Sequence, residues 1–268
     1  MKRTTLVLSI GAAVLAFVAA VSLMQNRLLY FPASATLEGI AVEDLQPWPD
    51  AAAFRGLLAP APATARATAV VFHGNAGHAG HRAAYARALA PLGVRVILAE
   101  YPGYGPRPGS PGEETLVADA AETLEQAHRA FGAPLVVVGE SLGAAVAAGA
   151  TARRPDLVTG LVLITPWDRL AHVAAHHYPW LPVRGLLRDV YESARRLESF
   201  ERPVVVAVAE HDRTVPARFG VALHSALNGP KQLRVVPGSD HNDWFGRVDA
   251  AWWAGAIGFA LGGPGGAK

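Results

Sequence analysis

The sequence contains no cysteine among its 268 residues. Disulfide bonds, thiolate metal sites and cysteine nucleophiles are therefore excluded together, although the absence of cysteine fits any cellular compartment. Charge is also sparse, because Asp, Glu, Lys and Arg make up only 17% of the chain, against about a quarter in typical domains. The formal net charge is +2 and no basic tract is longer than a pair of residues. We therefore expect no nucleic-acid partner.

Apolar residues, by contrast, are abundant and account for 51% of the chain. A chain of this length and composition can bury one substantial core or at most two small ones. Part of the apolar excess lies at the N-terminus, where Lys2 and Arg3 are followed by an uncharged run from Leu6 to Met24. Such a run spans about 28 Å as a helix, close to the hydrocarbon thickness of a bilayer.

The N-terminal run has two main interpretations. As a signal-anchor over residues 1–26, it holds the remaining domain, residues 27–268, on the non-cytoplasmic side of a membrane. As a cleavable signal, it is cut after Ala19-Ala20 and the protein is secreted. We favour the anchor because the apolar run continues through Leu23-Met24, past that cleavage site; a buried core helix is a third, less favoured reading.

The rest of the chain alternates short apolar runs with helical patterns. Strands are expected at Phe54–Leu58, Thr68–Phe72, Val94–Ala99, Leu135–Val138, Leu161–Ile164, Pro203–Ala209 and Gln232–Val236, and helices at 80–91, Glu113–Ala130, after Gly143, at 216–227 and at 247–261. This alternation predicts an α/β fold with a mainly parallel central sheet and helices on both faces. Residues 167–200 break the rhythm and are expected to form a small helical cap where ligands bind.

The segment Gly139-Glu140-Ser141-Leu142-Gly143 stands between an apolar strand and a helix of small residues. Strand, G-x-S-x-G and helix is the context of a nucleophile elbow, in which a sharp turn exposes the serine hydroxyl. Glycines are needed on both sides because side chains there collide with the neighbouring elements. A plain Gly-rich turn has the same pattern, so the flanking elements carry the prediction that Ser141 is a nucleophile.

A serine nucleophile needs a base and a group that orients the base, in the chain order Ser, acid, His on this architecture. Asp212 is the first choice for the acid because it follows the strand that ends at Ala209. Glu210 and Asp168 are the alternatives. His241 is the candidate base, in the loop that follows the strand ending at Val236.

The developing oxyanion needs preorganised donors, and backbone amides suit this role. Leu142, directly after the serine, supplies one. The second is expected from the loop His73-Gly74-Asn75-Ala76-Gly77, with the amide of Asn75 as first choice and that of Ala76 as second. The same loop could bind phosphate, but no Lys follows it and no G-x-x-x-x-G-K-[ST] motif occurs, which argues against nucleotide binding.

Together these motifs resemble the α/β-hydrolase superfamily, and within it the small membrane-anchored serine-hydrolase branch. The motifs are HGNAG at His73–Gly77, a YxGYG-type loop at Tyr101–Gly105, GxSxG at Gly139–Gly143, the acid and histidine segments Asp212–Pro216 and His241–Asp243, and the post-anchor join Leu29–Pro32. The resemblance covers roughly residues 27–260 and implies that Ser141, Asp212 and His241 form a triad. The sequence departs from this branch in the YxGYG-type loop, which has Pro102 where an Arg or other residue is frequent and continues into Pro106-Arg107-Pro108. The shape of the part of the site that this loop forms is therefore left open.

The resemblance implies a serine hydrolase that cleaves carboxylic ester or thioester bonds through an acyl-enzyme, without metal or cofactor. Trp167, Tyr178 and Trp180 suit an acyl or lipid-like substrate, although aromatic side chains at such positions also pack caps. A serine peptidase, an acyltransferase and a non-catalytic binding protein of the same fold remain alternatives.

Overall fold

The computed structural model describes residue 9, residues 24–60 and residues 64–263. The predicted membrane anchor, residues 1–26, therefore lies almost entirely outside the described residues. Within the part of the chain that is described, no helix has both the length and the apolar character needed to cross a bilayer. The anchor stays a prediction.

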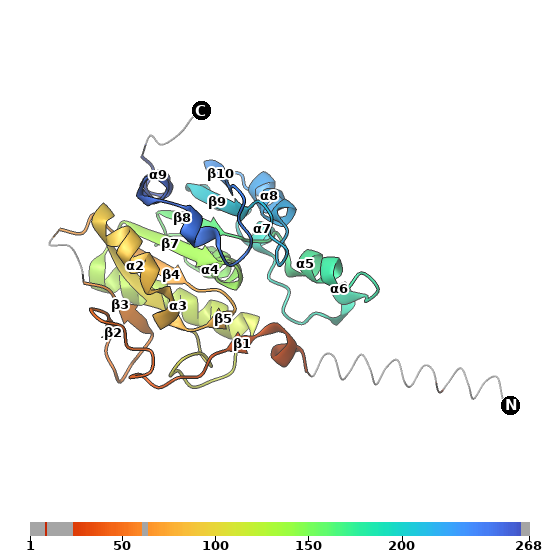
Figure 1. Cartoon of the computed structure of the whole chain (residues 1–268), viewed down its shortest axis with the longest axis horizontal. Coiled ribbons are helices and arrows are strands. Elements are labelled where there is room, and N and C mark those ends of the chain that lie inside the picture. The colour runs from red at the N-terminus through yellow and green to blue at the C-terminus, as the bar shows by residue number, and fades with distance from the viewer. Residues whose placement is uncertain (1–8, 10–23, 61–63, 264–268) are drawn as a thin grey trace.

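A single large sheet runs through the molecule (Figure 1). Its strands, in spatial order, are β10 (Lys231–Val236), β9 (Val204–Ala209), β8 (Gly160–Ile164), β7 (Leu135–Glu140), β4 (Ala67–Phe72), β6 (Val94–Ala99), β3 (Gly56–Leu58) and β2 (Gln46–Trp48). Neighbouring strands from β10 to β6 are parallel, whereas β3 pairs antiparallel with β6 and β2 antiparallel with β3. The prediction of a mainly parallel sheet is confirmed.

Helices cover both faces of this sheet, as predicted (Figure 1). One face carries α3 (Glu113–Phe131), α4 (Leu142–Arg153) and α8 (Ala217–Ala226), and the other carries α2 (Ala83–Leu89) and α9 (Ala250–Ala260). The helix expected over 80–91 is divided into η1 (Ala79–Arg82), α2 and η2 (Ala90–Leu92). Pro91 cannot donate a backbone hydrogen bond, and Gly93 then ends the segment in the left-handed conformation, with φ 73°.

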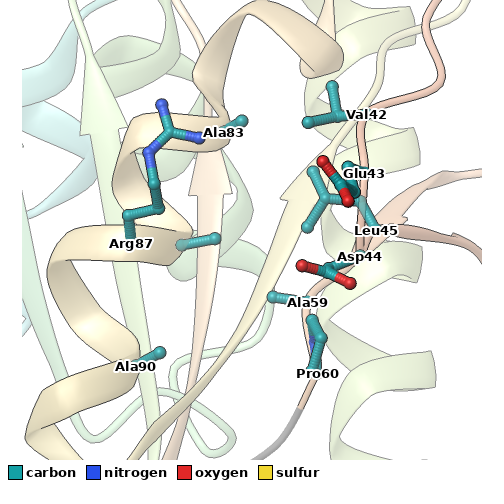
Figure 2. A pocket seen from close by; sticks show the side chains of 10 residues that line it. Val42, Glu43, Asp44, Leu45, Ala59, Pro60, Ala83, Arg87 and Ala90 are labelled. Carbon is teal, nitrogen blue, oxygen red and sulfur yellow. The ribbon is translucent and has the colours of Figure 1, made fainter.

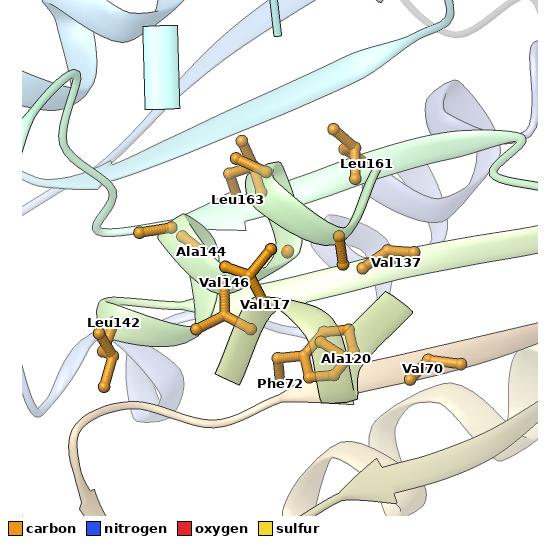
Figure 3. Close-up of a cluster of buried hydrophobic side chains, with 14 of the residues drawn as sticks. Val70, Phe72, Val117, Ala120, Val137, Leu142, Ala144, Val146, Leu161 and Leu163 are labelled. Atoms are coloured by element: carbon orange, nitrogen blue, oxygen red, sulfur yellow. The ribbon is translucent and has the colours of Figure 1, made fainter. Parts of the chain in front are cut away.

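The core beneath α3 and α4 is built from strand side chains that meet two helices (Figure 3). Val70, Phe72 and Val137 point from the sheet toward Val117 of α3 and Val146 of α4, and all five are buried. Because α4 consists largely of alanine and glycine, its backbone approaches the sheet closely. This close packing fixes the start of α4, which follows Ser141 directly.

The predicted cap region, residues 167–200, contains three short helices. These are α5 (Leu170–His177), α6 (Val183–Leu186) and α7 (Ser193–Arg196). In Figure 1, α5 and α6 project beyond the edge of the sheet where β8 ends, while α7 returns to α4. The cap therefore lies beside the carboxyl ends of the parallel strands, where ligands bind in open α/β sheets.

Residues 24–32, which we name the strap, join the sheet domain to the cap. The strap is helical at 24–29 and continues into β1 (Phe31–Pro32), which pairs in parallel with β5 (Ala76–Gly77) of the HGNAG loop. Gln25 is buried, and its side chain donates to the carbonyl oxygen of Leu186 at 2.9 Å and accepts from the backbone N–H of Arg188 at 2.8 Å. Two-residue strands have no sequence periodicity, so this arrangement was not predicted.

Candidate active site

Ser141 lies at the tight turn between β7 and α4. Its backbone has φ 53°, a left-handed conformation that is costly for a residue with a side chain and that concentrates at functional sites. A Cβ on Gly139 would lie 2.5 Å from the carbonyl oxygen of Gly143, and a Cβ on Gly143 would overlap the carbonyl oxygen of Phe72. The flanking glycines therefore let strand and helix approach closely enough to hold the serine in its strained position.

The structure brings the three predicted triad residues together. The Nε2 atom of His241 lies 3.0 Å from Oγ of Ser141, and its Nδ1 atom lies 2.7 Å from Oδ2 of Asp212. The three residues come from the ends of β7, β9 and β10, which are separated along the chain but open at one edge of the sheet. Their convergence follows from the parallel arrangement of the strands.

Asp212 is 6% exposed and is oriented by its own loop. Its Oδ1 atom accepts backbone hydrogen bonds from Thr214 at 2.9 Å and Val215 at 2.6 Å, which leaves Oδ2 free for His241. A carboxylate only accepts hydrogen bonds, so Nδ1 of His241 carries the proton. The lone pair of Nε2 then faces the hydroxyl of Ser141.

Asp240, which the sequence analysis did not single out, links the acid loop to the histidine loop. Its Oδ1 atom accepts from the backbone N–H of Arg213 at 3.0 Å and from that of His241 at 2.8 Å, and its Oδ2 atom accepts from Nε of Arg213 at 2.7 Å. The two backbone N–H groups, with the Arg213 guanidinium, lower the pKa of Asp240 to about 2. Asp240 therefore stays ionised and holds the two loops together at any physiological pH.

The loop predicted to supply an oxyanion donor lies beside the serine. Asn75 and Ala76 line the same cavity as Ser141 and Leu142. Leu142 is the first residue of α4, and the first N–H groups of a helix have no partner within it. The predicted donors Asn75 and Leu142 thus border the space in front of the serine hydroxyl.

The side chains of His73 and Glu100 form a buried pair that supports this loop. Nδ1 of His73 donates to the carbonyl oxygen of Gly74 at 2.7 Å, and Nε2 lies 2.9 Å from Oε1 of Glu100. Glu100 also accepts the backbone N–H of Ala79 at 2.9 Å. Both side chains are almost completely buried, so the loop rests on a dry polar contact with the end of β6.

The strap also holds the HGNAG loop, through hydrogen bonds to the side chain of Asn75. Its Nδ2 atom donates to the carbonyl oxygen of Leu29 at 2.5 Å, and its Oδ1 atom accepts from the backbone N–H of Phe31 at 3.2 Å and from the hydroxyl of Tyr104 at 3.0 Å. All three contacts join residues distant in sequence. The sequence predicted a role for the backbone amide of Asn75, but no pattern in it indicated the role of the side chain.

Tyr30 connects the strap to the cap. Its hydroxyl donates to Oδ2 of Asp189 at 2.5 Å and lies 2.9 Å from the hydroxyl of Tyr191. Burial, with the neighbouring Tyr191 and Asp189, holds the pKa of Tyr30 well above its usual value, so the hydroxyl keeps its proton. The strap is therefore bonded to the cap on one side and to the HGNAG loop on the other.

A cavity of about 380 Å³ opens in front of the triad. Its walls come from the strap, the cap and the triad loops: Leu28, Leu29, Tyr30, Phe31, Asn75, Ala76, Ser141, Leu142, Trp167, Leu170, Val173, Ala174, His177, Tyr178, Tyr191, Thr214, Val215, His241 and Asn242. None of these lining residues is acidic, and most are apolar. The cavity suits an uncharged, apolar group next to the serine.

The alternative acids lie outside the triad. Oδ2 of Asp168 contacts Nδ1 of His172 at 2.7 Å, and Oε2 of Glu210 accepts from the backbone N–H of Gly238 at 2.7 Å. Among the cap histidines, His177 lines the cavity and its Nε2 atom donates to the carbonyl oxygen of Thr214 at 2.8 Å. It thereby ties the cap to the acid loop.

A second hollow, of about 480 Å³, lies away from the triad, between residues 42–45 and α2 (Figure 2). Figure 2 shows Glu43, Asp44 and Arg87 among short apolar side chains. Its lining contains neither serine nor histidine, and none of the predicted site residues lies there. Across the described residues, no cluster of three or more His, Asp or Glu side chains is placed to hold a metal ion.

Comparisons with known proteins concern the family of the chain. A family profile described as serine aminopeptidase, S33, matches residues 63–184. An uncharacterized protein of Mycobacterium tuberculosis is 40% identical over 232 residues, which cover 82% of this chain and 81% of that protein. Lysophosphatidylserine lipase ABHD12 of Danio rerio is 30% identical over 190 residues, covering 62% of this chain and 50% of the lipase.

Among solved structures, the monoacylglycerol lipase of Paleococcus ferrophilus superposes with a TM-score of 0.56 at 20% identity, covering 74% of this chain and 97% of that chain. At this identity the likeness concerns the fold alone. The mainly parallel sheet and the relatives found by sequence both fit that fold. The chain belongs to the α/β-hydrolase superfamily, as its ordered motifs predicted.

Proposed function

We propose that this hydrolase cleaves carboxylic ester or thioester bonds of acyl or lipid-like substrates, with Ser141 as nucleophile. His241 takes the proton of the Ser141 hydroxyl as its oxygen attacks the carbonyl carbon. Asp212 keeps His241 in the required tautomer, and the backbone N–H groups of Asn75 and Leu142 stabilise the oxyanion. The proton passes from His241 to the leaving oxygen or sulfur, and a water molecule activated by the same histidine then releases the acid.

One observation carries this proposal: a single imidazole lies between a serine hydroxyl at 3.0 Å and a buried carboxylate at 2.7 Å. Both distances are within hydrogen-bond reach, as proton transfer requires. The strained φ of Ser141 is the second supporting feature, because it presents the hydroxyl at the turn.

The lining of the cavity favours an acyl chain over a charged substrate. Leu28, Leu170 and Val173 face it from the strap and cap, beside the ring of Trp167. Among the similar proteins, ABHD12 of Danio rerio is a lysophosphatidylserine lipase, and the structure from Paleococcus ferrophilus is a monoacylglycerol lipase. This similarity supports an ester of an apolar acyl group as the substrate class here.

An aminopeptidase, the activity named by the family profile, is the second candidate. A free peptide N-terminus carries a positive charge, and burying it requires a compensating negative group. No acidic residue lines the cavity, so the geometry favours esters. Hydrolysis of short p-nitrophenyl esters should exceed that of aminoacyl p-nitroanilides; cleavage of the amides alone would overturn the ester assignment.

The nucleophile is tested by Ser141→Ala. We expect ester hydrolysis to fall at least about 10³-fold while the fold is retained, and labelling by a fluorophosphonate probe to be lost. Circular dichroism and the melting temperature serve as the folding control. Persistent labelling of the folded variant would show that another serine is the nucleophile.

A further inference from the structure

Large apolar side chains are exposed around the mouth of the active-site cavity. Leu28, Phe31 and Tyr178 line the cavity and are 56%, 58% and 53% exposed, so each has one side toward solvent. Trp180 is 73% exposed, and its ring packs edge-on against that of Tyr178, with the ring centres 6.4 Å apart. Strap and cap thus both contribute exposed apolar side chains at the cavity, and we name these the mouth surface: Leu28, Phe31, Tyr178 and Trp180.

Exposed large apolar side chains are concentrated in one part of the molecule. Six of the eight exposed large apolar side chains in the described residues belong to the strap or the cap, namely Met24, Leu28, Phe31, Tyr178, Trp180 and Val190. The other two, Val221 on α8 and Val235 on β10, lie on different elements. Single exposed apolar residues are normal, whereas a cluster marks an interaction surface.

The exposed charged side chains beside the mouth surface are basic. Arg27 in the strap and Arg184 and Arg188 in the cap are exposed, whereas Asp189, the acid next to Arg188, is half-buried and accepts from the hydroxyl of Tyr30. Apolar aromatic groups flanked by arginine are the composition that binds anionic lipid surfaces. A basic, apolar rim complements a bilayer that carries negative headgroups.

The place of the strap in the sequence also points to a lipid bilayer. The uncharged run of residues 6–24 ends where the strap begins, and Figure 1 places the strap and the tip of the cap at the same end of the molecule. Gln25 fixes that relation through its hydrogen bonds to Leu186 and Arg188. A chain that enters the domain from an apolar segment therefore arrives beside the mouth.

We propose that the mouth surface docks the catalytic cavity on an anionic lipid bilayer, so that acyl substrates pass from the bilayer to the serine without crossing water. The proposal deepens the proposed function, because it assumes that the cavity behind the mouth is the catalytic one. It assigns the contact to the folded domain itself, separately from the N-terminal run.

Trp180 reports on docking directly, because it is the most exposed of the six tryptophans. The full-length chain is reconstituted into phosphatidylcholine vesicles with and without phosphatidylserine, and brominated lipids are used to quench tryptophan fluorescence. We expect strong quenching in the anionic vesicles, and we expect most of it to disappear in Trp180→Phe. Absence of quenching in the wild type would refute docking.

Kinetics separate docking from chemistry. Trp180→Ser and the double variant Arg184→Glu/Arg188→Glu change residues outside the cavity lining. We expect each to lower hydrolysis of a long-chain ester embedded in anionic vesicles about tenfold and to leave hydrolysis of a soluble short-chain ester within about twofold. Val235→Ser, which removes an exposed apolar side chain from β10, away from the mouth surface, should change neither rate.

The outcomes distinguish the two proposals. If the wild type hydrolyses the soluble ester but Trp180→Ser and Val235→Ser behave alike on vesicles, docking is wrong and the proposed function stands. If the wild type hydrolyses neither ester, the proposed function fails first. If Trp180→Ser instead abolishes self-association in solution without affecting vesicle hydrolysis, the mouth surface is an interface between copies of the chain and the lipid proposal is overturned.

Discussion

The carboxamide of Asn75 is held at both of its polar ends, by the carbonyl oxygen of Leu29 and by the backbone N–H of Phe31. The same residue is proposed to supply an oxyanion donor through its backbone N–H. The hydrogen bonds of its side chain hold the residue in place and so fix the direction of that N–H. The donors of an oxyanion hole act only when they are already aimed at the developing charge. Asn75 is therefore both a proposed donor, through its main chain, and a positioning residue, through its side chain.

We expect Asn75→Ala to lower kcat for a short ester about tenfold to a hundredfold with little change in KM, because misplaced donors cost rate rather than ground-state binding. Tyr104→Phe, which removes only one of the contacts to Oδ1, is the matched control and should have a much smaller effect. A rise in KM at unchanged kcat would show that the carboxamide serves substrate binding instead.

Gly143 tests the elbow in a different way. Its Cβ position is occupied by the carbonyl oxygen of Phe72, so Gly143→Ala should force α4 away from the sheet and lower the free energy of unfolding by about 1–3 kcal/mol or more. Gly258 on α9 has open space at its Cβ position. The control Gly258→Ala should therefore raise stability by about 0.5–1 kcal/mol. Equal melting temperatures for the two variants would contradict this account of the elbow.

At the scale of elements, the strap is attached through side chains that satisfy backbone groups of the cap. Oε1 of Gln25 accepts from the N–H groups of Arg188 and Asp189, while Nε2 donates to Leu186. All these atoms lie in a buried or partly buried setting, where an unpaired polar group costs about 1–3 kcal/mol. The strap and the cap should therefore loosen together.

Gln25→Ala tests this coupling. We expect a lower melting temperature and faster amide hydrogen exchange at residues 186–189, since three backbone groups of the cap lose their partner. Gln126→Ala, which removes a surface contact to Glu122 on α3, is the control and should change neither measurement. Exchange that rises throughout the chain, with no excess at 186–189, would point to a general loss of stability and argue against a specific clamp.

The elements that the sequence predicted well are those with a strong internal pattern. Val94–Ala99 was predicted with the bounds observed, and Leu135–Glu140 was predicted two residues short, because parallel strands covered on both faces are continuous apolar runs. Ser141, Asp212 and His241, each chosen because it follows a strand, lie within hydrogen-bond distance of one another, and their catalytic roles stay a prediction.

What the sequence could not show are contacts between segments far apart in the chain. The strap bonds the cap across more than 160 residues, and β1 and β5 are two residues long each. Polar residues such as Gln25 and Asp189 have no pattern that distinguishes a buried clamp from a solvated surface. Asp240 was missed for the same reason, because its partner Arg213 belongs to another loop.

At the scale of the whole molecule, the sheet separates two cores that share no side chains. One lies under α3, α4 and α8, and the other lies under α2 and α9. Stacked layers in such folds are about 10 Å apart, so side chains on opposite faces have little direct contact. Substitutions on the two faces should then act independently.

Leu124→Ala on α3 and Ile257→Val on α9 test this separation, because both side chains are fully buried. We expect losses of about 2–5 and about 0.5–1.5 kcal/mol respectively. In the double variant the losses should add to within about 0.5 kcal/mol, measured by urea unfolding with a single transition. A deviation well above that value would show that the sheet transmits packing changes from one face to the other.

The strap also sets an order of events for a chain made from its N-terminus. Gln25 is synthesised more than 160 residues before Leu186 and Arg188, which at cellular rates is a delay of roughly ten to thirty seconds. During that interval the side chain of Gln25 lacks its native partners in the cap. Gln25 is thus among the last residues to reach its native contacts, and the cavity in front of Ser141 is not fully enclosed until the cap has folded.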